Sequence, residues 1–362
     1  MTIYLLNLFL IILFSIIIKS KKKYVILISI QLFLILACRN VELGVDLPNY
    51  QAGFNYIKSL DFLDMLSRLN FIDIARLRYP FSYESGYVIL NWIVSNLGIN
   101  FHGFLIICAL INIVSIGYFV YKYSDMPWLS FFILCTFGTF TYFFGIIRQS
   151  LALSFFLWSI HFAIENKKIK SLLFFMFAFL NHRAVVIMLP LYLFLKRDVL
   201  SRKKIIILFL CSIPFFAMSN FIYSNVISII MAFFGKGYQG HSMQLNNLLI
   251  LLYVISFIVI ITLNFKKIEK NKMVIISIIA LIISLYVEII GLYNDNFARS
   301  VQMYNAFLLI NIPCVVKQYN SQKIVLMIKL IIIIALTLLY IYTLNGSEIV
   351  PYEIQTSNFF FG

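Results

Sequence analysis

The sequence lacks the short motifs that mark several large enzyme classes. It contains no GxxxxGK[ST], HExxH or GxSxG pattern, so ATP hydrolysis through a P-loop, zinc proteolysis of that type and serine hydrolysis have no support. Cysteine is scarce, and no two cysteines form a CxxC pair, so neither a disulfide framework nor a metal site is indicated. The cysteines lie in or at the ends of apolar runs and are interpreted as small buried side chains: Cys38, Cys108, Cys135, Cys211 and Cys314.

Charged residues are also few. They make up 12% of the 362 residues, against 62% hydrophobic residues, which is typical of an integral membrane protein. The net charge of +15 does not point to nucleic acid, because the basic residues form short clusters between apolar runs rather than a stripe with interleaved aromatic side chains. We therefore interpret these clusters as signals of membrane topology and expect no nucleic-acid partner.

The predicted fold is an all-α, polytopic helical bundle with about 10–12 transmembrane segments. The lysines at 19–23 follow the first apolar run instead of preceding it, which predicts a retained first span rather than a cleaved signal peptide. If the basic clusters lie in the cytoplasm, as is usual for membrane proteins, both chain ends lie on the extracytoplasmic side. The apolar runs lie near 3–18, 24–38, 101–121, 128–147, 149–164, 205–234, 247–265, 273–291, 301–316 and 324–344.

The apolar segment 171–195 has two possible layouts. Basic clusters precede and follow it, and both are expected in the cytoplasm. If the other spans are assigned correctly, the segment must therefore enter the membrane and return to the same side. Each half would be ~17 Å long as a helix, too short to cross ~30 Å of hydrocarbon, which favours a re-entrant hairpin with Asn181-His182-Arg183 at its tip. In the alternative, the run 205–234 splits at Pro214 or at Ser219-Asn220, and 171–195 crosses once.

A single membrane domain is predicted for residues 1–362, and the long polar stretch within it is 39–100. Under the predicted topology this stretch is an extracytoplasmic subdomain that faces the substrate. Apolar positions at helical spacing over 57–78 predict a helix that lies at the membrane interface. A solvated cap on the bundle is the alternative interpretation.

Arginines outside the cytoplasmic clusters are candidates for an anion site. A charged side chain at the bilayer centre costs about 2.5–3.5 kcal/mol on insertion scales, so such residues usually face a polar cavity. Guanidinium groups also match phosphate oxygens well. Structural ion pairs with Asp46, Glu84, Glu288 or Asp295 are the alternative. The candidates are Arg39, Arg148, Arg183 and Arg299.

Three residues are candidates for a general base. His182 lies in an apolar segment at a predicted turn, where an imidazole can accept a proton near neutral pH. Asp46 and Glu84 lie in turn-like contexts and are alternatives to it. A buried structural histidine and ordinary ion pairs would explain the same three residues.

In this order and spacing, these residues resemble the EpsG family, polytopic proteins grouped with Wzy-type O-antigen and exopolysaccharide polymerases. Arg39 with Gly44-Val45-Asp46 and Tyr50 resembles the family's segment after the second span. Glu84-Ser85-Gly86-Tyr87 is similar to its E-x-G-Y element, and Arg148-Gln149 with Ala152 resembles its R-Q-x-x-A helix. Asn181-His182 lies at the family histidine, and Arg299 with Tyr304 resembles the late arginine–tyrosine pair. The family often has a small hydroxyl residue where this chain has Ala184.

The resemblance implies a polymerase of the bacterial inner membrane with its active site facing the periplasm. It would move a growing glycan from undecaprenyl pyrophosphate onto the next lipid-linked repeat unit, with inversion and without a metal or cofactor. A flippase or transporter of the same lipid, or a glycan ligase, is the alternative. Expected partners are the lipid-linked oligosaccharide, membrane lipids and a chain-length regulator protein. The implied substrate contacts are Gln149, Tyr50, Tyr87 and Tyr304.

Overall fold

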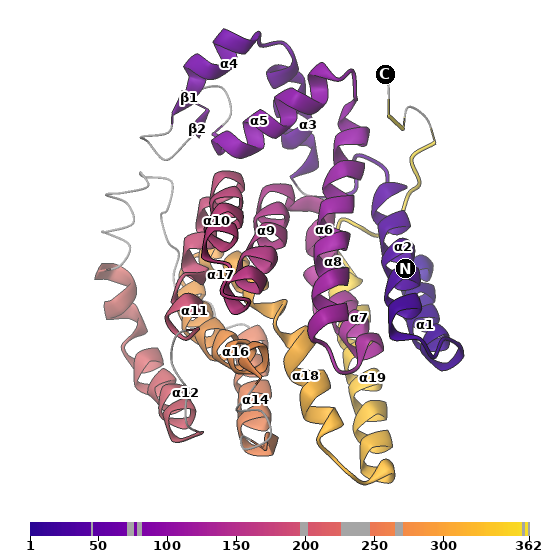
Figure 1. The fold of residues 1–362 in the computed structure, drawn as a ribbon, viewed down its shortest axis with the longest axis vertical. Helices are drawn as coiled ribbons and strands as arrows, with labels where there is room; N and C mark the ends of the chain where they lie inside the picture. Colours follow the sequence, from indigo (N-terminus) through magenta and orange to yellow (C-terminus); the bar gives the residue numbers. More distant parts are fainter. Residues whose placement is uncertain are drawn as a thin grey trace. The chain divides into compact units, whose positions relative to one another are not determined.

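The structure is a computed structural model, and it confirms the predicted all-α membrane fold. It describes residues 1–44, 46–70, 76–77, 82–195, 202–225, 247–264, 271–356 and 359–360. The helices and strands (Figure 1) are α1 (Thr2–Ile17), α2 (Lys21–Ala37), α3 (Leu47–Lys58), α4 (Phe62–Arg68), β1 (Leu69–Asn70), β2 (Arg76–Leu77), α5 (Ser85–Asn96), α6 (Phe101–Tyr123), α7 (Pro127–Thr136), α8 (Thr139–Gly145), α9 (Ile147–Ile164), α10 (Lys168–Asn181), the 3-10 helix η1 (Arg183–Met188), α11 (Pro190–Leu193), α12 (Arg202–Ala217), α14 (Asn247–Thr262), α16 (Lys272–Gly291), α17 (Asp295–Asn305), α18 (Leu308–Lys317) and α19 (Gln322–Leu344).

The chain divides into two compact units. The first comprises Met1–Tyr123, Phe131–Val186 and Ile332–Gly362, and the second comprises Ser124–Ser130 and Ile187–Ile331. The polar stretch 39–100 belongs to the first unit. That unit also holds α5, α9 and α10, which carry or border most of the candidate site residues.

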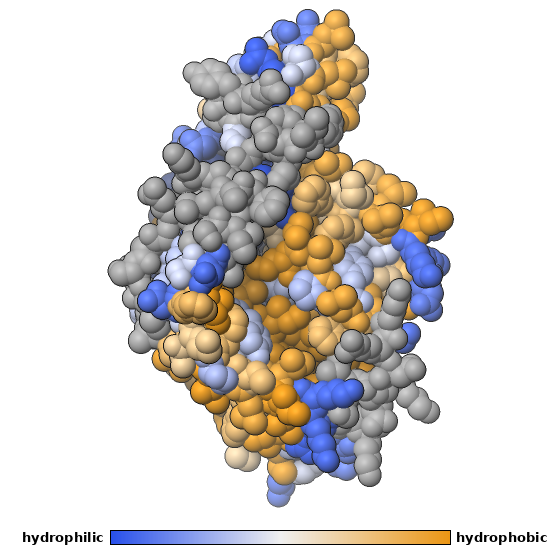
Figure 2. Space-filling view, turned by 90° about the vertical axis from the view of Figure 1, so that its left-hand side faces the viewer, coloured by the Kyte–Doolittle hydropathy of each residue, from blue (hydrophilic) through white to orange (hydrophobic). Residues whose placement is uncertain are grey.

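Four described helices, α6, α9, α16 and α19, are long and apolar enough to cross a membrane, and the number rises to six if two bent pairs each form one span. The sequence predicts about ten to twelve spans, and the difference arises because several apolar runs fold as helices of 10–17 residues. Part of the predicted run 205–234 lies outside the described residues. Figure 2 shows apolar side chains over broad areas of the surface, as contact with hydrocarbon requires.

The predicted run 128–147 is a broken helix. α7 and α8 meet at 52° across Phe137-Gly138, and Gly138 adopts a left-handed conformation with φ of 88°, which glycine reaches without steric cost. A second break follows α12, which meets the next helix, Ser219–Asn225, at 79°. This is close to one of the break points that the alternative layout requires.

Hydrogen bonds between polar side chains hold α6, α9 and α10 together. Asn112 of α6 donates to Ser150 Oγ at 3.0 Å and accepts from Ser154 at 2.8 Å, while Ser159 donates to the carbonyl of Ser171 on α10. All five residues are buried. Because lipid supplies no hydrophobic force between helices, such polar contacts and close packing fix their arrangement.

The helices α3, α4 and α5 lie across one end of α6, α9 and α10 (Figure 1), and we call them the cap.

The prediction of one continuous helix over 57–78 is wrong. Helix α3 ends at Lys58, Asp61 accepts a hydrogen bond from the Asp64 amide at 2.6 Å and starts α4, and the chain then forms the antiparallel pair β1–β2. The N-cap at Asp61 interrupts the helix although its apolar spacing continues.

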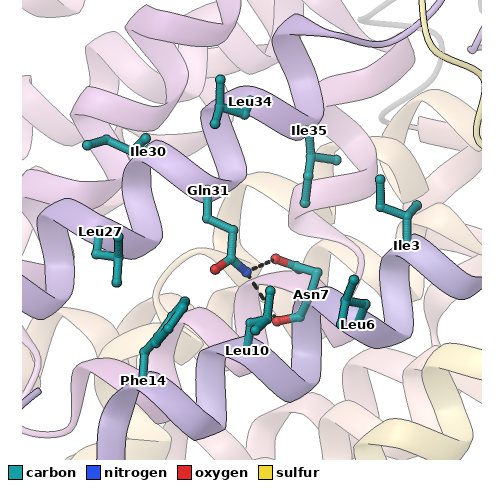
Figure 3. Close-up of a pocket in the computed structure, with 10 residues that line it drawn as sticks. All are labelled: Ile3, Leu6, Asn7, Leu10, Phe14, Leu27, Ile30, Gln31, Leu34 and Ile35. Atoms are coloured by element: carbon teal, nitrogen blue, oxygen red, sulfur yellow. Dashed lines mark hydrogen bonds between the residues drawn. The ribbon is translucent and has the colours of Figure 1, made fainter. Parts of the chain in front are cut away.

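A shallow groove of about 340 Å³ runs between α1 and α2 (Figure 3). Its lining is apolar except for Asn7 and Gln31. These two residues bond to each other, because Gln31 Nε2 donates to Asn7 Oδ1 at 2.6 Å and to the Asn7 carbonyl at 3.3 Å. Asn7 in turn donates to Cys135 Sγ at 3.3 Å. These bonds link α1, α2 and α7.

Residues 349–356 form a strap over one end of α1 and one end of α2. Backbone bonds of 2.9 Å join Asn40 N to the Glu353 carbonyl and Gln355 N to the Cys38 carbonyl, and Arg39 pairs with Ile354 as an antiparallel bridge. We call residues 349–356 the C-terminal strap. No pattern in the sequence predicts this pairing.

Candidate active site

Three helix ends meet at the carboxylate of Glu84. Glu84 is the N-cap residue of α5, Arg148 is the second residue of α9, and His182 ends α10 in an extended conformation with φ of −158°. The break at Ile146 between α8 and α9 places Arg148 in the first turn of a new helix rather than in the middle of a long one. Each side chain is therefore fixed by a helix terminus.

Glu84 binds three basic residues. Its Oε2 accepts a bond of 2.6 Å from Arg148 Nη1, and its Oε1 lies 3.1 Å from Nδ1 of His182. Oε1 also lies 3.4 Å from the amide nitrogen of Arg183, which donates to it, and 3.9 Å from Arg183 Nε. The carboxylate is 5% exposed, so its contacts are shielded from water and are stronger than surface pairs. We call Glu84, Arg148, His182 and Arg183 the Glu84 cluster.

Within its four residues, the Glu84 cluster holds two guanidinium groups and one carboxylate, which is an excess of one positive charge. The Asp46 carboxylate acts on Tyr50 and Tyr83 beside the cluster and is not part of this count. Burial alone would raise the pKa of the Glu84 carboxyl, but Arg148 and His182 outweigh burial and hold that pKa at about 2. Glu84 is therefore ionised at every physiological pH, and the excess charge favours binding of an anion.

Arg148 and His182 each retain a nitrogen with no partner in the described parts of the chain. Arg148 bonds through Nη1 and Nε, and His182 bonds through Nδ1. Both side chains are 23% exposed. Nη2 of Arg148 and Nε2 of His182 are thus the groups that a bound molecule could contact.

Tyrosine rings form a wall beside Arg148. The guanidinium carbon lies 5.0 Å from the ring centre of Tyr83 and 5.7 Å from that of Tyr50, which are cation–π contacts. Tyr87 packs against both rings, with centroid distances of 5.3 and 5.7 Å. Burial raises the pKa of Tyr50 although Arg148 acts against the shift, so its hydroxyl stays protonated and can donate.

Six predicted site residues therefore lie together: Tyr50, Glu84, Tyr87, Arg148, His182 and Arg183. Asp46 is nearby, because its carbonyl accepts from the Tyr50 amide at 3.0 Å. Gln149 is buried next to Arg148.

Among the described residues, Arg39 is not a partner of the Glu84 cluster, and Arg299 and Tyr304 belong to the second unit. Arg39 is 1% exposed and donates to the Leu36 carbonyl at 2.9 Å. Arg299 and Tyr304 lie on α17 in the second unit, where Tyr304 donates to the Ile187 carbonyl. The roles predicted for these three residues stay predictions.

Tyr83 is a site residue that no sequence pattern predicts. Its ring is the nearer of the two that contact Arg148, and its hydroxyl donates to the Asn49 carbonyl at 2.8 Å. The available signal in the sequence is its position next to Glu84. This signal is weak, because an aromatic residue beside an acidic one is not a distinctive pattern and its partner, Arg148, is 65 positions away.

Gly86 allows α5 to approach α10 closely. A Cβ at this position would lie 2.7 Å from Leu180 Cβ and 2.8 Å from the Leu180 carbonyl oxygen, which is closer than packing tolerates. Leu180 is two residues from His182, so separation of the helices would also separate His182 from Glu84.

We expect Gly86→Ala to destabilise the protein by about 1–3 kcal/mol, the usual cost of overpacking, and to lower its activity. Thermal unfolding in detergent measures the first effect. Gly98→Ala is the comparison, because no atom lies within 4 Å of its Cβ position, although φ of 78° adds a backbone cost there. Equal activity of Gly86→Ala and the wild type would show that the helix contact does not position the site.

No three His, Cys, Asp or Glu side chains lie together as a metal site among the described residues. The Glu84 cluster supplies one carboxylate and one imidazole beside two guanidinium groups. Guanidinium groups repel a divalent cation and attract phosphate oxygens. The donor set thus suits an anion.

The fold and the cluster define a multi-pass helical membrane protein with a buried, positively charged polar site. The profile of the EpsG family matches residues 22–354, nearly the whole chain. The protein belongs to the EpsG family, a family of Wzy-like polysaccharide polymerases. No curated protein and no solved structure matches the chain.

Proposed function

We propose that this protein extends a surface polysaccharide, transferring the growing glycan from undecaprenyl pyrophosphate onto the next lipid-linked repeat unit. The observation that carries the proposal is the excess positive charge of the Glu84 cluster. Family membership supports a polymerase in general, and a positively charged, partly enclosed site suits a donor whose leaving group is an anionic pyrophosphate.

The reaction breaks the bond between the anomeric carbon and the pyrophosphate oxygen. The acceptor hydroxyl oxygen forms the new bond to that carbon, and the electron pair of the broken bond leaves with undecaprenyl pyrophosphate. Direct displacement inverts the anomeric configuration. Arg148 and Arg183 stabilise the negative charge that develops on the leaving group, which fixed donors do effectively in a site of low dielectric constant.

His182 accepts the proton of the attacking hydroxyl. Its Nδ1 faces Glu84 at 3.1 Å, which orients the ring and leaves Nε2 for the acceptor. Glu84 itself is a weak base, because its pKa is about 2. Glu84 is therefore a positioning residue that holds His182 and Arg148, and Asp46 is the second candidate for the base.

The tyrosine wall backs the guanidinium that we assign to pyrophosphate. The Tyr50, Tyr83 and Tyr87 rings lie beside it and are at most 6% exposed, so they hold Arg148 in place. Gln149 follows Arg148 directly. Gln149, Tyr50 and Tyr87 are the proposed substrate-binding residues of the first unit, and Arg299 and Tyr304 are proposed separately in the second unit.

We place the protein in the bacterial inner membrane with the Glu84 cluster facing the periplasm. The support is the series of basic clusters, which cytoplasmic loops favour. Lipid-linked oligosaccharide and membrane lipids are the proposed ligands, and a chain-length regulator is the proposed protein partner.

The decisive experiment uses the purified protein in detergent with undecaprenyl-pyrophosphate-linked repeat units and without nucleotide or metal. A ladder of glycan lengths on a gel supports polymerisation. Transfer of one preformed chain would indicate a ligase instead. Binding of the lipid without any product would indicate a transporter, and loss of the ladder in chelator would contradict the metal-free scheme.

We expect His182→Gln to slow polymer formation about 10²–10⁴-fold, the usual contribution of a general base. His161→Gln is the matched control. His161 is also a buried histidine beside a glutamate, with its Nε2 3.5 Å from Oε1 of Glu165, and it lies at the end of α9 opposite to Arg148. An unchanged rate of polymer formation in folded His182→Gln would assign the base to Asp46.

A further inference from the structure

Arg39 is a buried cation outside the Glu84 cluster. It follows the end of α2, is 1% exposed, and its guanidinium carbon lies 5.3 Å from the centre of the Phe144 ring. Nη1 donates to the Leu36 carbonyl at 2.9 Å. The C-terminal strap pairs with the backbone on both sides of Arg39, so the side chain lies beneath a closed layer of protein.

One edge of this guanidinium has no partner. Nε and Nη2 of Arg39 are buried and donate to no described residue, and no carboxylate is among the charges that act on the guanidinium. Nε and Nη2 lie on the same side of the planar group, where two parallel N–H bonds grip an anion. The edge that is left open is thus the one best suited to an anion.

The charge of Arg39 is not neutralised by ionisation of its neighbours. Burial lowers the pKa of Arg39 to about 10, so the guanidinium is charged at neutral pH. Burial also raises the pKa of Tyr352 to about 12, so this phenol of the strap is neutral. An isolated buried charge is costly unless it is paired and hydrogen-bonded, and here the protein provides a single carbonyl and an aromatic face.

We propose that Arg39 binds a small inorganic anion, of the halide class and foremost chloride, beneath the C-terminal strap. The strap and the Phe144 ring enclose the guanidinium, which favours a monatomic ion over the pyrophosphate ligand that the sequence predicts for Arg39. The anion completes the hydrogen bonding of Nε and Nη2 and stabilises the packing of the strap on α1 and α2. The inference is independent of the glycan transfer proposed for the Glu84 cluster.

The test measures thermal unfolding of the full-length protein in detergent by tryptophan fluorescence. Sodium gluconate is replaced stepwise by sodium chloride or sodium bromide at constant ionic strength. We expect a saturable rise of several degrees in Tm for the wild type and no rise for Arg39→Met. Arg202→Met is the matched control, because Arg202 is an exposed arginine, and its response should equal that of the wild type.

Three outcomes would overturn the proposal. One is the absence of a halide effect in the wild type, and another is an equal effect in all three proteins, which would be a general salt effect. The third is a response to inorganic pyrophosphate without a response to halide, which would assign Arg39 to pyrophosphate. If Arg39→Met does not fold, anomalous diffraction from wild-type crystals grown in bromide decides. The proposal requires an anomalous bromide peak within hydrogen-bonding distance of Arg39 Nε and Nη2, and the absence of that peak would overturn it.

Discussion

Replacement of Arg148 by methionine is expected to reduce the rate of polymer formation about 10²–10³-fold. This is the usual cost of removing one fixed donor from a developing negative charge. Arg148 is the partly exposed cation of the Glu84 cluster, with one nitrogen directed at no described residue and the rest bonded to Glu84, Tyr50 and the Ser82 carbonyl. Methionine keeps the apolar length of the side chain, so the change chiefly removes charge and donors.

The gel assay with lipid-linked repeat units measures this rate. Arg68→Met is the matched control, because Arg68 also stacks on a tyrosine ring, 5.6 Å from the centre of Tyr56, and donates to its hydroxyl. The control should keep its activity. Arg148→Lys should restore little, because an ammonium group cannot bind phosphate and Glu84 through a planar fork. Full activity of folded Arg148→Met would remove the proposed pyrophosphate site.

Replacement of Glu84 by glutamine is expected to abolish activity and to destabilise the fold by about 3–5 kcal/mol, the cost of breaking a buried ion pair by removing one partner. Arg148 and Arg183 would then face each other without the carboxylate that separates them, and His182 would lose the acceptor that orients its ring. Thermal unfolding and the gel assay report the two effects separately.

The matched control is Glu165→Gln, which removes a glutamate that also pairs with a histidine and two lysines but is more exposed. Its effect should be small, because exposed pairs are screened by water. Loss of activity without loss of stability in Glu84→Gln would show that Glu84 acts in catalysis rather than in holding the helices.

The stabilisation from Glu84 should depend on pH in a defined window. Its pKa in the folded protein is about 2, below the ordinary value of 4.5, so the stabilisation is complete above about pH 4.5 and is lost as the pH falls towards 2. The difference in Tm between the wild type and Glu84→Gln should therefore be constant from pH 8 to 5 and shrink below pH 4.5. A difference that shrinks between pH 8 and 6 would place the titrating group elsewhere.

The sequence predicts much of the site because polar residues are conspicuous in an apolar chain. Arg148 and His182 interrupt apolar runs, and Glu84 lies in a turn, so each attracts attention separately. The sequence does not predict that the three side chains bond to each other, since the partners are 64 and 98 positions apart. Their convergence follows from the packing of α5 and α9 with α10, which no local pattern encodes.

The fold is predicted in class and less well in detail. Apolar spacing predicts helices but does not show where a side chain caps a new one, and Asp61 therefore breaks the helix expected over 57–78. The strap is missed because its bonds to residues 38–40 use backbone groups, and backbone pairing over 300 positions leaves no mark on residue type. Tyr83 is missed for a related reason, since its role depends on an arginine that only the fold brings close.

The C-terminal strap also affects how the protein is made. A ribosome supplies residues 349–356 only after it has translated every helix of the structure, and these residues close over Arg39, which was synthesised more than 300 residues earlier. During biogenesis the first unit therefore remains incomplete until residues 349–356 have been translated, because only these residues close over Arg39. A ribosome that stalls shortly before these codons would leave a chain in which every described helix has been translated and the cover over Arg39 is missing.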